Sequence, residues 1–238
     1  MLERVLFYSP YGRWYDHTLA EITLAHALRL RGAETHFLLC HELYGECDLY
    51  RQSTTPRDDE SCFRCIQSQK TIFKNLAMPY TWLGETSGRE EKGRLWRWAQ
   101  TILKPALRRA TYKGYPVAQW ASASYREHFG LAHLEIQNVL HERVFRAYLA
   151  STALAIEMLS EALTRIEPQT LILLSGTYFS HRVAVELALE RQIRVLLYQR
   201  GEYGTALEFR DSLVPGLLSS TLPLWSAWKT VPLTMTEI

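Results

Sequence analysis

The sequence lacks an apolar stretch long enough to cross a bilayer, and it lacks a strong excess of charge of either sign. No apolar run reaches the ~18 residues that a transmembrane helix needs, so we expect no membrane-spanning segment. The 27 Lys and Arg residues nearly balance the 25 Asp and Glu residues, which leaves a net charge of +2. Modules that bind duplex nucleic acid concentrate positive charge on one face. Nucleic acid is therefore not an expected partner.

The sequence also lacks repeats, a dinucleotide-binding fingerprint and a signal peptide. No internal repeat or low-complexity tract is present. No Gly-x-Gly-x-x-Gly pattern follows the predicted strands, which argues against a dinucleotide-binding turn. The opening residues 1–7 include an acid and too short an apolar run for a secretory signal, so we expect a cytoplasmic protein. What is present is 47% hydrophobic and 12% aromatic residues, enough for the full core of a globular protein.

Two segments, residues 4–40 and 170–198, predict strand–helix–strand units. In each, a short apolar strand runs into a turn, a helix with apolar residues at helical spacing follows, and a second apolar strand ends the unit. Gly32 is placed to end the first helix, and Ser180 is placed to cap the second. Because parallel strands need a crossover helix, the sequence predicts an α/β fold: a Rossmann-like, doubly wound, mainly parallel sheet with helices on both faces.

The chain between these units is predicted to be mostly helical. A helix over residues 96–107 contains Pro105, which predicts a kink or a break. A longer helix is predicted from about 134 to 166, because apolar residues recur there on one face. The segment at about 40–75 is polar instead and contains all four cysteines. It predicts a Cys-rich excursion from the sheet.

The four cysteines are Cys40, Cys47, Cys62 and Cys65, and they predict a metal centre. In the Cys62-Phe-Arg-Cys65 pair, two intervening residues let both thiolates face one ion, and the two upstream thiolates complete a tetrahedral set. We therefore predict a structural zinc ion that staples the polar segment, with an iron–sulfur cluster as an alternative. The spacing is looser than in a zinc ribbon, so free thiols or one disulfide are open alternatives.

Three loops that follow predicted strands carry polar residues where an open parallel sheet places its ligand crevice. In the first loop, residues 9–17, Gly12 permits close backbone approach and Arg13 suits a phosphate or a carboxylate. Asp16 or His17 is the candidate catalytic base, and we favour His17. The alternative is that the aromatic residues of this loop pack over the sheet edge while Asp16 caps a helix.

The second and third loops add candidate substrate-binding residues. The second leads into a helix N-terminus, which is a natural anion site, although an ordinary strand-to-helix turn is the alternative. The third lies beyond the last predicted parallel strand. Because three strand-to-loop exits converge, we predict that they line one pocket. The candidates in these two loops are Gly176, Thr177, His181, Arg182, Arg200 and Glu202.

The order of these segments is similar to that of a known enzyme class. The similarity runs through residues 4–40, Cys47, the Cys62-Phe-Arg-Cys65 pair and Pro79-Tyr-Thr-Trp-Leu83, and it is strongest from Leu171 to Gly201. There the chain has a strand ending in a Gly loop, a helix, and a strand ending in Tyr198-Gln-Arg-Gly201. Together these features resemble bacterial glycosyltransferases of the GT-B type, associated with capsule and cell-surface polysaccharides. Gln199 stands where an acidic residue is expected.

This resemblance implies a domain organisation and an activity. GT-B enzymes have two Rossmann-like domains, and the nucleotide-sugar is held mainly by the C-terminal one. Residues 1–215 would then form the N-terminal, acceptor-side domain with a Cys-rich insertion at about 40–75, and residues 216–238 an interdomain linker or tail.

The expected activity is transfer of a sugar from a nucleotide-sugar to a glycan, glycolipid or other hydroxyl acceptor. The partner is a C-terminal nucleotide-sugar-binding domain that this chain lacks, so we expect the chain alone to be inactive. A non-enzymatic, metal-stapled α/β binding module is the alternative. A nucleotide-using enzyme complete in this chain is a third hypothesis.

Overall fold

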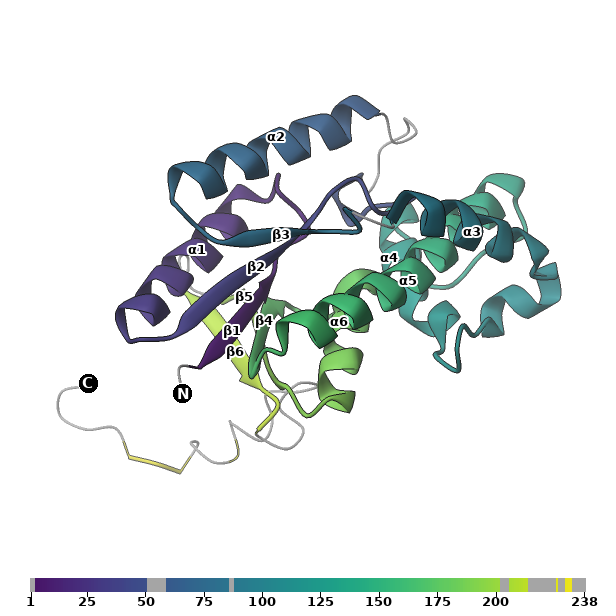
Figure 1. The fold of residues 1–238 in the computed structure, drawn as a ribbon. Coiled ribbons are helices and arrows are strands. Elements are labelled where there is room, and N and C mark those ends of the chain that lie inside the picture. The colour runs from purple at the N-terminus through teal and green to yellow at the C-terminus, as the bar shows by residue number, and fades with distance from the viewer. Residues whose placement is uncertain are drawn as a thin grey trace.

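A six-stranded sheet with helices on both faces organises the chain in the computed structural model (Figure 1). The structure describes residues 3–50, 59–85, 88–201, 206–213, 226 and 230–232. In chain order the elements are β1 (Arg4–Tyr8), α1 (Tyr15–Leu30), β2 (Glu34–Cys40), η1 (Asp48–Tyr50), α2 (Asp59–Asn75), β3 (Tyr80–Leu83), α3 (Gly88–Thr101), η2 (Lys104–Arg109), α4 (Val117–Phe129), α5 (Val139–Ile166), β4 (Thr170–Leu174), α6 (Phe179–Glu190), β5 (Arg194–Arg200) and β6 (Leu207–Asp211).

The strand order β3-β2-β1-β4-β5-β6 is doubly wound. Strands β1 to β5 pair in parallel, and β6 is antiparallel to β5. The winding direction reverses at β1, because β2 lies on one side of it and β4 on the other. Open α/β sheets bind ligands at such a switch point, beyond the carboxyl ends of the strands. The predicted Rossmann-like α/β fold is confirmed.

Strands β3 and β6 are not among the strands that the sequence predicts. The first, Tyr80–Leu83, is a four-residue strand at one edge of the sheet, and only Trp82 and Leu83 in it are buried. The second, Leu207–Asp211, reads Leu-Glu-Phe-Arg-Asp and is half exposed at the sheet edge. Neither segment has the continuous apolar run that marks a buried parallel strand.

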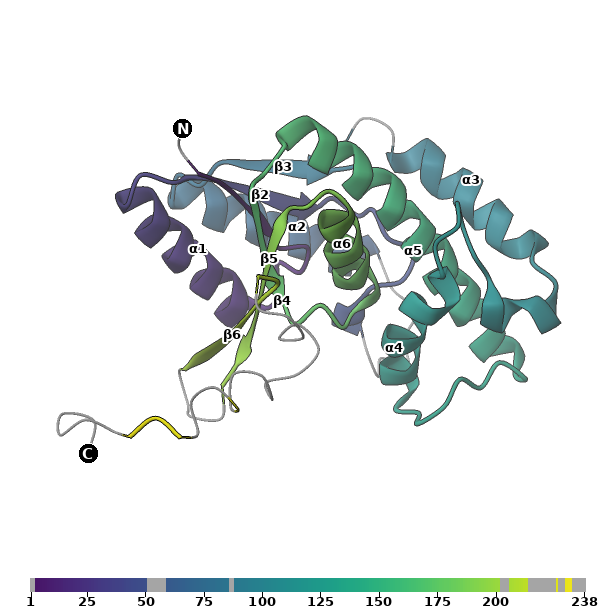
Figure 2. The ribbon, with the colours of Figure 1, turned by 90° about the horizontal axis from the view of Figure 1, so that it is seen from below.

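The two faces of the sheet bury different apolar clusters, because successive side chains of a strand point to opposite sides. On β1, Val5 and Phe7 pack with residues of α1 and α2, whereas Leu6 and Tyr8 pack with residues of α5 and α6. Figures 1 and 2 show these helix pairs on opposite sides of the sheet, with α3 and α4 lying outside α5. Both cores therefore depend on the same strands.

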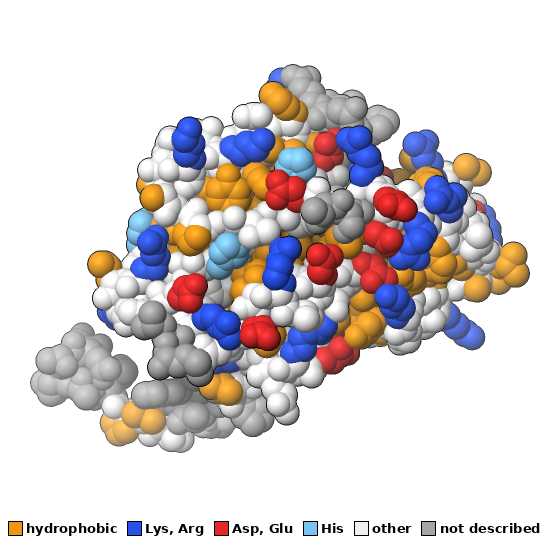
Figure 3. All heavy atoms as spheres, in the orientation of Figure 1, with side chains coloured by type: hydrophobic (Ala, Val, Ile, Leu, Met, Phe, Trp, Pro, Cys, Tyr) orange, Lys and Arg blue, Asp and Glu red, His pale blue; other side chains and the backbone are white. Residues whose placement is uncertain are grey.

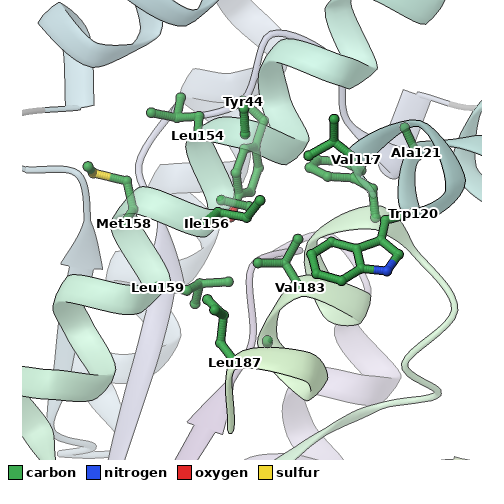
Figure 4. Close-up of a cluster of buried hydrophobic side chains, with 14 of the residues drawn as sticks. Tyr44, Val117, Trp120, Ala121, Leu154, Ile156, Met158, Leu159, Val183 and Leu187 are labelled. Carbon is green, nitrogen blue, oxygen red and sulfur yellow. The ribbon is translucent and has the colours of Figure 1, made fainter. Parts of the chain in front are cut away.

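The long helix α5 is buried over most of its length. Its start lies at Val139, later than the predicted 134, and the side chain of Asn138 caps it by accepting a hydrogen bond from the Leu140 N–H at 2.7 Å. The sequence predicts one apolar face, but the structure encloses α5 between the sheet-covering α6 and the outer helices α3 and α4. Figure 4 shows side chains of α5 meeting those of α6 and α4 in this cluster.

Several predicted boundaries shift in ways that matter for the site. Helix α1 begins at Tyr15, so Asp16 and His17 belong to its first turn rather than to a loop. The prediction that Ser180 caps the second helix is wrong. Tyr178 occupies the N-cap position of α6, and no side chain caps this helix. The predicted break at Pro105 is present, since α3 ends at Thr101 and Pro105 lies in η2.

The surface of the described residues carries mixed charge. Figure 3 shows Lys and Arg side chains interspersed with Asp and Glu on the face that it draws, as the balanced composition predicts. None of the helices in the described ranges is long and apolar enough to cross a membrane. Apart from residues 226 and 230–232, the segment 216–238, predicted as a linker or tail, lies outside the described residues.

Candidate functional site

An open hollow of about 420 Å³ lies beyond the carboxyl ends of β4 and β5, beside the first turn of α1. We call it the outer hollow. It draws residues from all three predicted loops, which the sheet brings together at the switch point. Its lining residues are Arg13, Trp14, Tyr15, Asp16, His17, Leu174, Tyr178 and Arg200.

Aromatic rings form one wall of the outer hollow. The ring centroids of Trp14 and Tyr178 lie 5.4 Å apart, and Trp14 also packs on the buried Tyr11 at 4.5 Å. Tyr11 is in edge contact with Tyr178 at 6.2 Å. Such a wall offers both apolar contact area and a polar edge to a ligand. The predicted alternative, aromatic packing over the sheet edge, therefore coexists with a ligand-accessible surface.

Charged side chains stand at the rim. Arg200 and Asp16 form an ion pair of 3.1 Å, and both side chains are exposed. An exposed pair of this kind adds little to stability, so it is free to exchange partners with a ligand. Arg13 is also exposed on the same rim.

His17 lies between the charged rim and the buried floor. Its ring is half-buried, 5.9 Å from the ring of Tyr198 and 6.0 Å from that of Trp14. Burial lowers the pKa of His17, the Arg200 cation lowers it further, and Asp16 acts in the opposite direction. The imidazole is therefore neutral at physiological pH, which is the protonation state that a general base needs.

A smaller cavity, the inner chamber, lies beneath the outer hollow and shares Trp14, His17 and Leu174 with it. It has room for about one water-sized group. Its lining residues are Tyr8, Ser9, Pro10, Tyr11, Trp14, His17, Thr18, Glu21, Leu174, His181 and Tyr198.

Glu21 contributes a buried carboxyl group to the inner chamber. The Tyr198 hydroxyl donates a hydrogen bond of 2.8 Å to Glu21 Oε1. Burial raises the pKa of Glu21 to about 8, and the hydroxyls of Ser9 and Tyr198 offset this only in part. The carboxyl group is therefore protonated at neutral pH.

His181 lies opposite, in the first turn of α6. Its ring packs edge-on against Tyr8 at 5.4 Å and Tyr11 at 5.2 Å. Burial lowers the pKa of His181 to about 3, so this imidazole is neutral as well. Tyr11 is held in place because its hydroxyl donates to Asp48 Oδ2 at 2.7 Å and lies 3.1 Å from Ser180 Oγ.

Four of the predicted binding residues lie outside both cavities. Gly12 packs on α2, where an added Cβ would lie 2.2 Å from the Gln69 Cγ atom. Gly176 adopts φ +70° in the turn after β4 and packs against Leu197. The other two are exposed: Thr177, and Arg182, which pairs with Glu186 at 2.5 Å.

Of the other predicted residues, Arg13, Asp16, His17 and Arg200 line the outer hollow, and His181 lines the inner chamber. Glu202 lies outside the described residues.

Glu21 is one of the site residues that the sequence does not predict. A signal for it is present, because Thr18, Ile22 and Ala25 define the buried stripe of α1 and Glu21 lies within that stripe. A carboxyl group on an apolar helix face indicates either a buried partner or a shifted pKa. Tyr11 and Tyr178 are missed for a different reason, since only the packing of α6 against the first loop makes them neighbours.

The predicted four-sulfur zinc centre is wrong. No disulfide joins the four cysteines, which line one small hollow beside Pro10, but in the described part of the chain no group of three or more His, Cys, Asp and Glu side chains is arranged to hold a metal ion. Cys62 and Cys65 lie on the continuous helix α2, not in the tight turn of a zinc knuckle. Burial raises the pKa of Cys65 to about 12 and that of Cys47 well above its usual range.

Comparisons with known proteins leave the family open. No protein-family model matches the sequence, and neither does any curated protein. Among solved structures, the chain is similar to a CDPS from Fluoribacter dumoffii, at 12% identity and a TM-score of 0.48, over 88% of this chain and 90% of that chain. That neighbour is not a glycosyltransferase, but a similarity this distant neither supports nor contradicts the resemblance to GT-B enzymes.

Proposed function

We propose that the chain is the acceptor-side domain of a glycosyltransferase that moves a sugar from a nucleotide-sugar to a hydroxyl acceptor. The observation that carries the proposal is the neutral His17, half-buried beside an open hollow with an aromatic wall. Aromatic faces suit the apolar faces of sugar rings, and the rim residues Arg13 and Arg200 suit negative charge on a donor. The proposal places the protein in the cytoplasm, with a glycan or glycolipid as acceptor.

The chemistry assigned to this site is a displacement at the anomeric carbon. His17 removes the proton from an acceptor hydroxyl, and the oxygen forms a bond to the anomeric carbon of the donor sugar. The bond from that carbon to the phosphate oxygen breaks, and the nucleoside diphosphate leaves with the electron pair. The proton remains on His17 until solvent or the leaving group accepts it. The donor itself would be held by a second domain that faces the outer hollow.

The test is turnover of a panel of nucleotide-sugars by the chain joined to its donor-binding domain. His17→Ala should lower kcat by at least ~10², the usual range for loss of a general base. His26→Ala is the matched control, because His26 is an exposed residue of the same helix, and it should leave kcat unchanged. Near-wild-type turnover in His17→Ala would remove His17 from the mechanism.

Two other outcomes of this assay would distinguish the transferase from the alternative functions. Ligand binding without turnover of any nucleotide-sugar would overturn the transferase proposal in favour of a binding module. Turnover by the isolated chain would instead mean that its active site is complete.

A further inference from the structure

Two buried polar atoms at the inner chamber have no hydrogen-bond partner among the described residues. They are Oε2 of Glu21 and Nδ1 of His181. Both residues line the chamber and are at most 4% exposed. Buried polar atoms in native proteins are nearly always paired, so two orphans at one small cavity indicate that something else pairs with them.

The protonation states limit what that partner can be. Glu21 is protonated and His181 is neutral at pH 7, so neither brings a net charge into the chamber. The charged groups of the site, Arg13, Asp16 and Arg200, line the outer hollow only. An ion in the chamber would be desolvated without a counter-charge, which is costly. The chamber is therefore suited to an uncharged group.

The donor and acceptor pattern suits a group that can both donate and accept, which is a hydroxyl or a water molecule. A protonated carboxyl can donate one hydrogen bond, and a neutral imidazole nitrogen can donate or accept according to its tautomer. A hydroxyl group both donates and accepts, and it fits a space the size of one water.

We propose that the inner chamber is a subsite for one uncharged hydroxyl of a polyhydroxylated ligand, held between Glu21 and His181. The rest of the ligand lies in the outer hollow against Trp14 and Tyr178 and reaches the chamber past the shared residues His17 and Leu174. The assignment of this ligand as the sugar acceptor rests on the proposed function; the subsite itself does not.

The experiment measures binding to the 238-residue chain by saturation-transfer NMR. The probes are the methyl glycosides of glucose, galactose and mannose, with the matching sugar phosphates as charged competitors. We expect at least one neutral glycoside to bind. Glu21→Leu and His181→Phe, which keep the apolar packing, should each weaken that binding about tenfold or more, because each leaves the buried hydroxyl without a partner.

Two further variants distinguish loss of the subsite from misfolding of the protein. Glu21→Gln retains a donor and an acceptor and should bind within about threefold of wild type. Glu186→Leu makes the same Glu-to-Leu change on α6, at a residue that lines neither cavity, and should bind as wild type does. Far-UV circular dichroism checks that each variant is folded.

The outcomes distinguish this proposal from the proposed function. If no neutral glycoside binds, or if binding is unchanged in both Glu21→Leu and His181→Phe, the chamber holds only a water molecule and the subsite is refuted, whatever the transferase assay shows. Binding that depends on Glu21 and His181 but comes without turnover of any nucleotide-sugar would support the subsite and refute the transferase.

Discussion

Glu21 and His17 are four residues apart on α1, yet their surroundings shift their pKa values in opposite directions. His17 is half-buried and lines the outer hollow, whereas Glu21 is buried and lines only the inner chamber. The environment moves the pKa of the carboxyl group up to about 8 and that of the imidazole down. Pairs of titratable groups shifted in opposite directions are typical of acid–base sites.

The raised pKa of Glu21 predicts a pH-dependent stability. Its pKa rises from its ordinary value of 4.5 to about 8 on folding, so within that window the folded protein binds more protons than the unfolded chain. The free energy of unfolding therefore falls as pH rises. His181 opposes this change only weakly above pH 7, because its ordinary pKa is 6.5 and its imidazole is then mostly neutral in the unfolded chain, as it is in the folded protein. Between pH 7 and 8 we expect a loss of about 1 kcal/mol.

Urea denaturation at several pH values measures this slope. Glu21→Gln cannot titrate and should show no such loss above pH 7. Parallel profiles for the wild type and Glu21→Gln would mean that the carboxyl group ionises normally in the folded protein.

Gly12 lies where the structure leaves no room for a larger side chain. A Cβ there would lie 2.7 Å from Gln69 Cδ and 2.9 Å from the Cys65 carbonyl oxygen. Gln69 cannot easily move, since it is buried and its Nε2 donates to the Ser9 carbonyl at 2.8 Å. Gly12→Ala should therefore lower the free energy of unfolding by about 1–3 kcal/mol, the usual cost of overpacking.

The matched control is Gly93→Ala in α3. Its nearest neighbour would be Arg97 Nη1 at 3.7 Å, so there is room for the methyl group. This substitution should raise stability by up to about 1 kcal/mol through helix propensity. Equal effects of the two substitutions in urea denaturation would contradict the close packing of the first loop on α2.

At the scale of elements, the end of α3 is joined to α5 through a buried guanidinium. Arg146 Nη1 donates to the carbonyl oxygens of Ala99 at 2.6 Å and Ile102 at 2.8 Å. Its Nη2 donates to Glu142 at 2.8 Å. Carbonyl groups at a helix C-terminus have no intrahelical partner. Arg146 therefore supplies the hydrogen-bond donors that the carbonyl groups at the end of α3 lack.

Arg146→Met should therefore lower the free energy of unfolding by about 2–4 kcal/mol, because it leaves these carbonyl groups without their charged donor. Arg182→Met is the control, since Arg182 is exposed and pairs only within one helix turn with Glu186. The control should change stability by less than about 0.5 kcal/mol. Thermal and urea unfolding of the two variants measure the difference, and similar values would show that Arg146 is not needed to hold α3.

At the scale of the whole molecule, the sheet joins the two cores. Residues of β1, β2 and β4 contribute to both apolar clusters, so we expect the two cores to form together. The site lies at the edge of this shared sheet, where the outer hollow is open to solvent. An open site leaves a sugar donor without the orientation that catalysis requires.

We therefore expect the 238-residue chain alone to fold but not to transfer sugar. Unfolding followed by circular dichroism and by tryptophan fluorescence should give coincident transitions. A glycosyl-transfer assay across a panel of nucleotide-sugars should show no turnover. Transfer at the rate of an ordinary transferase would refute the two-domain proposal, and separate transitions would refute the shared core.

Local sequence patterns are enough to predict the strand–helix–strand units and therefore the parallel sheet. Apolar runs such as residues 170–174 and helical spacing of apolar residues are local signals, and crossover geometry leaves few topologies. The same patterns also predict that Arg13, His17 and Arg200 meet, because parallel strands end at one edge.

Long-range packing sets which of the remaining residues share an environment. Burial of Glu21 and His181 depends on where α1 and α6 pack, and residues 160 positions apart in the chain become the two sides of one chamber. The cysteines show how a local pattern can mislead. The spacing of Cys62 and Cys65 predicted a zinc knuckle, but both residues lie in the helix α2. Spacing in a sequence fixes a geometry only when the local backbone is known, and that backbone is set by long-range packing.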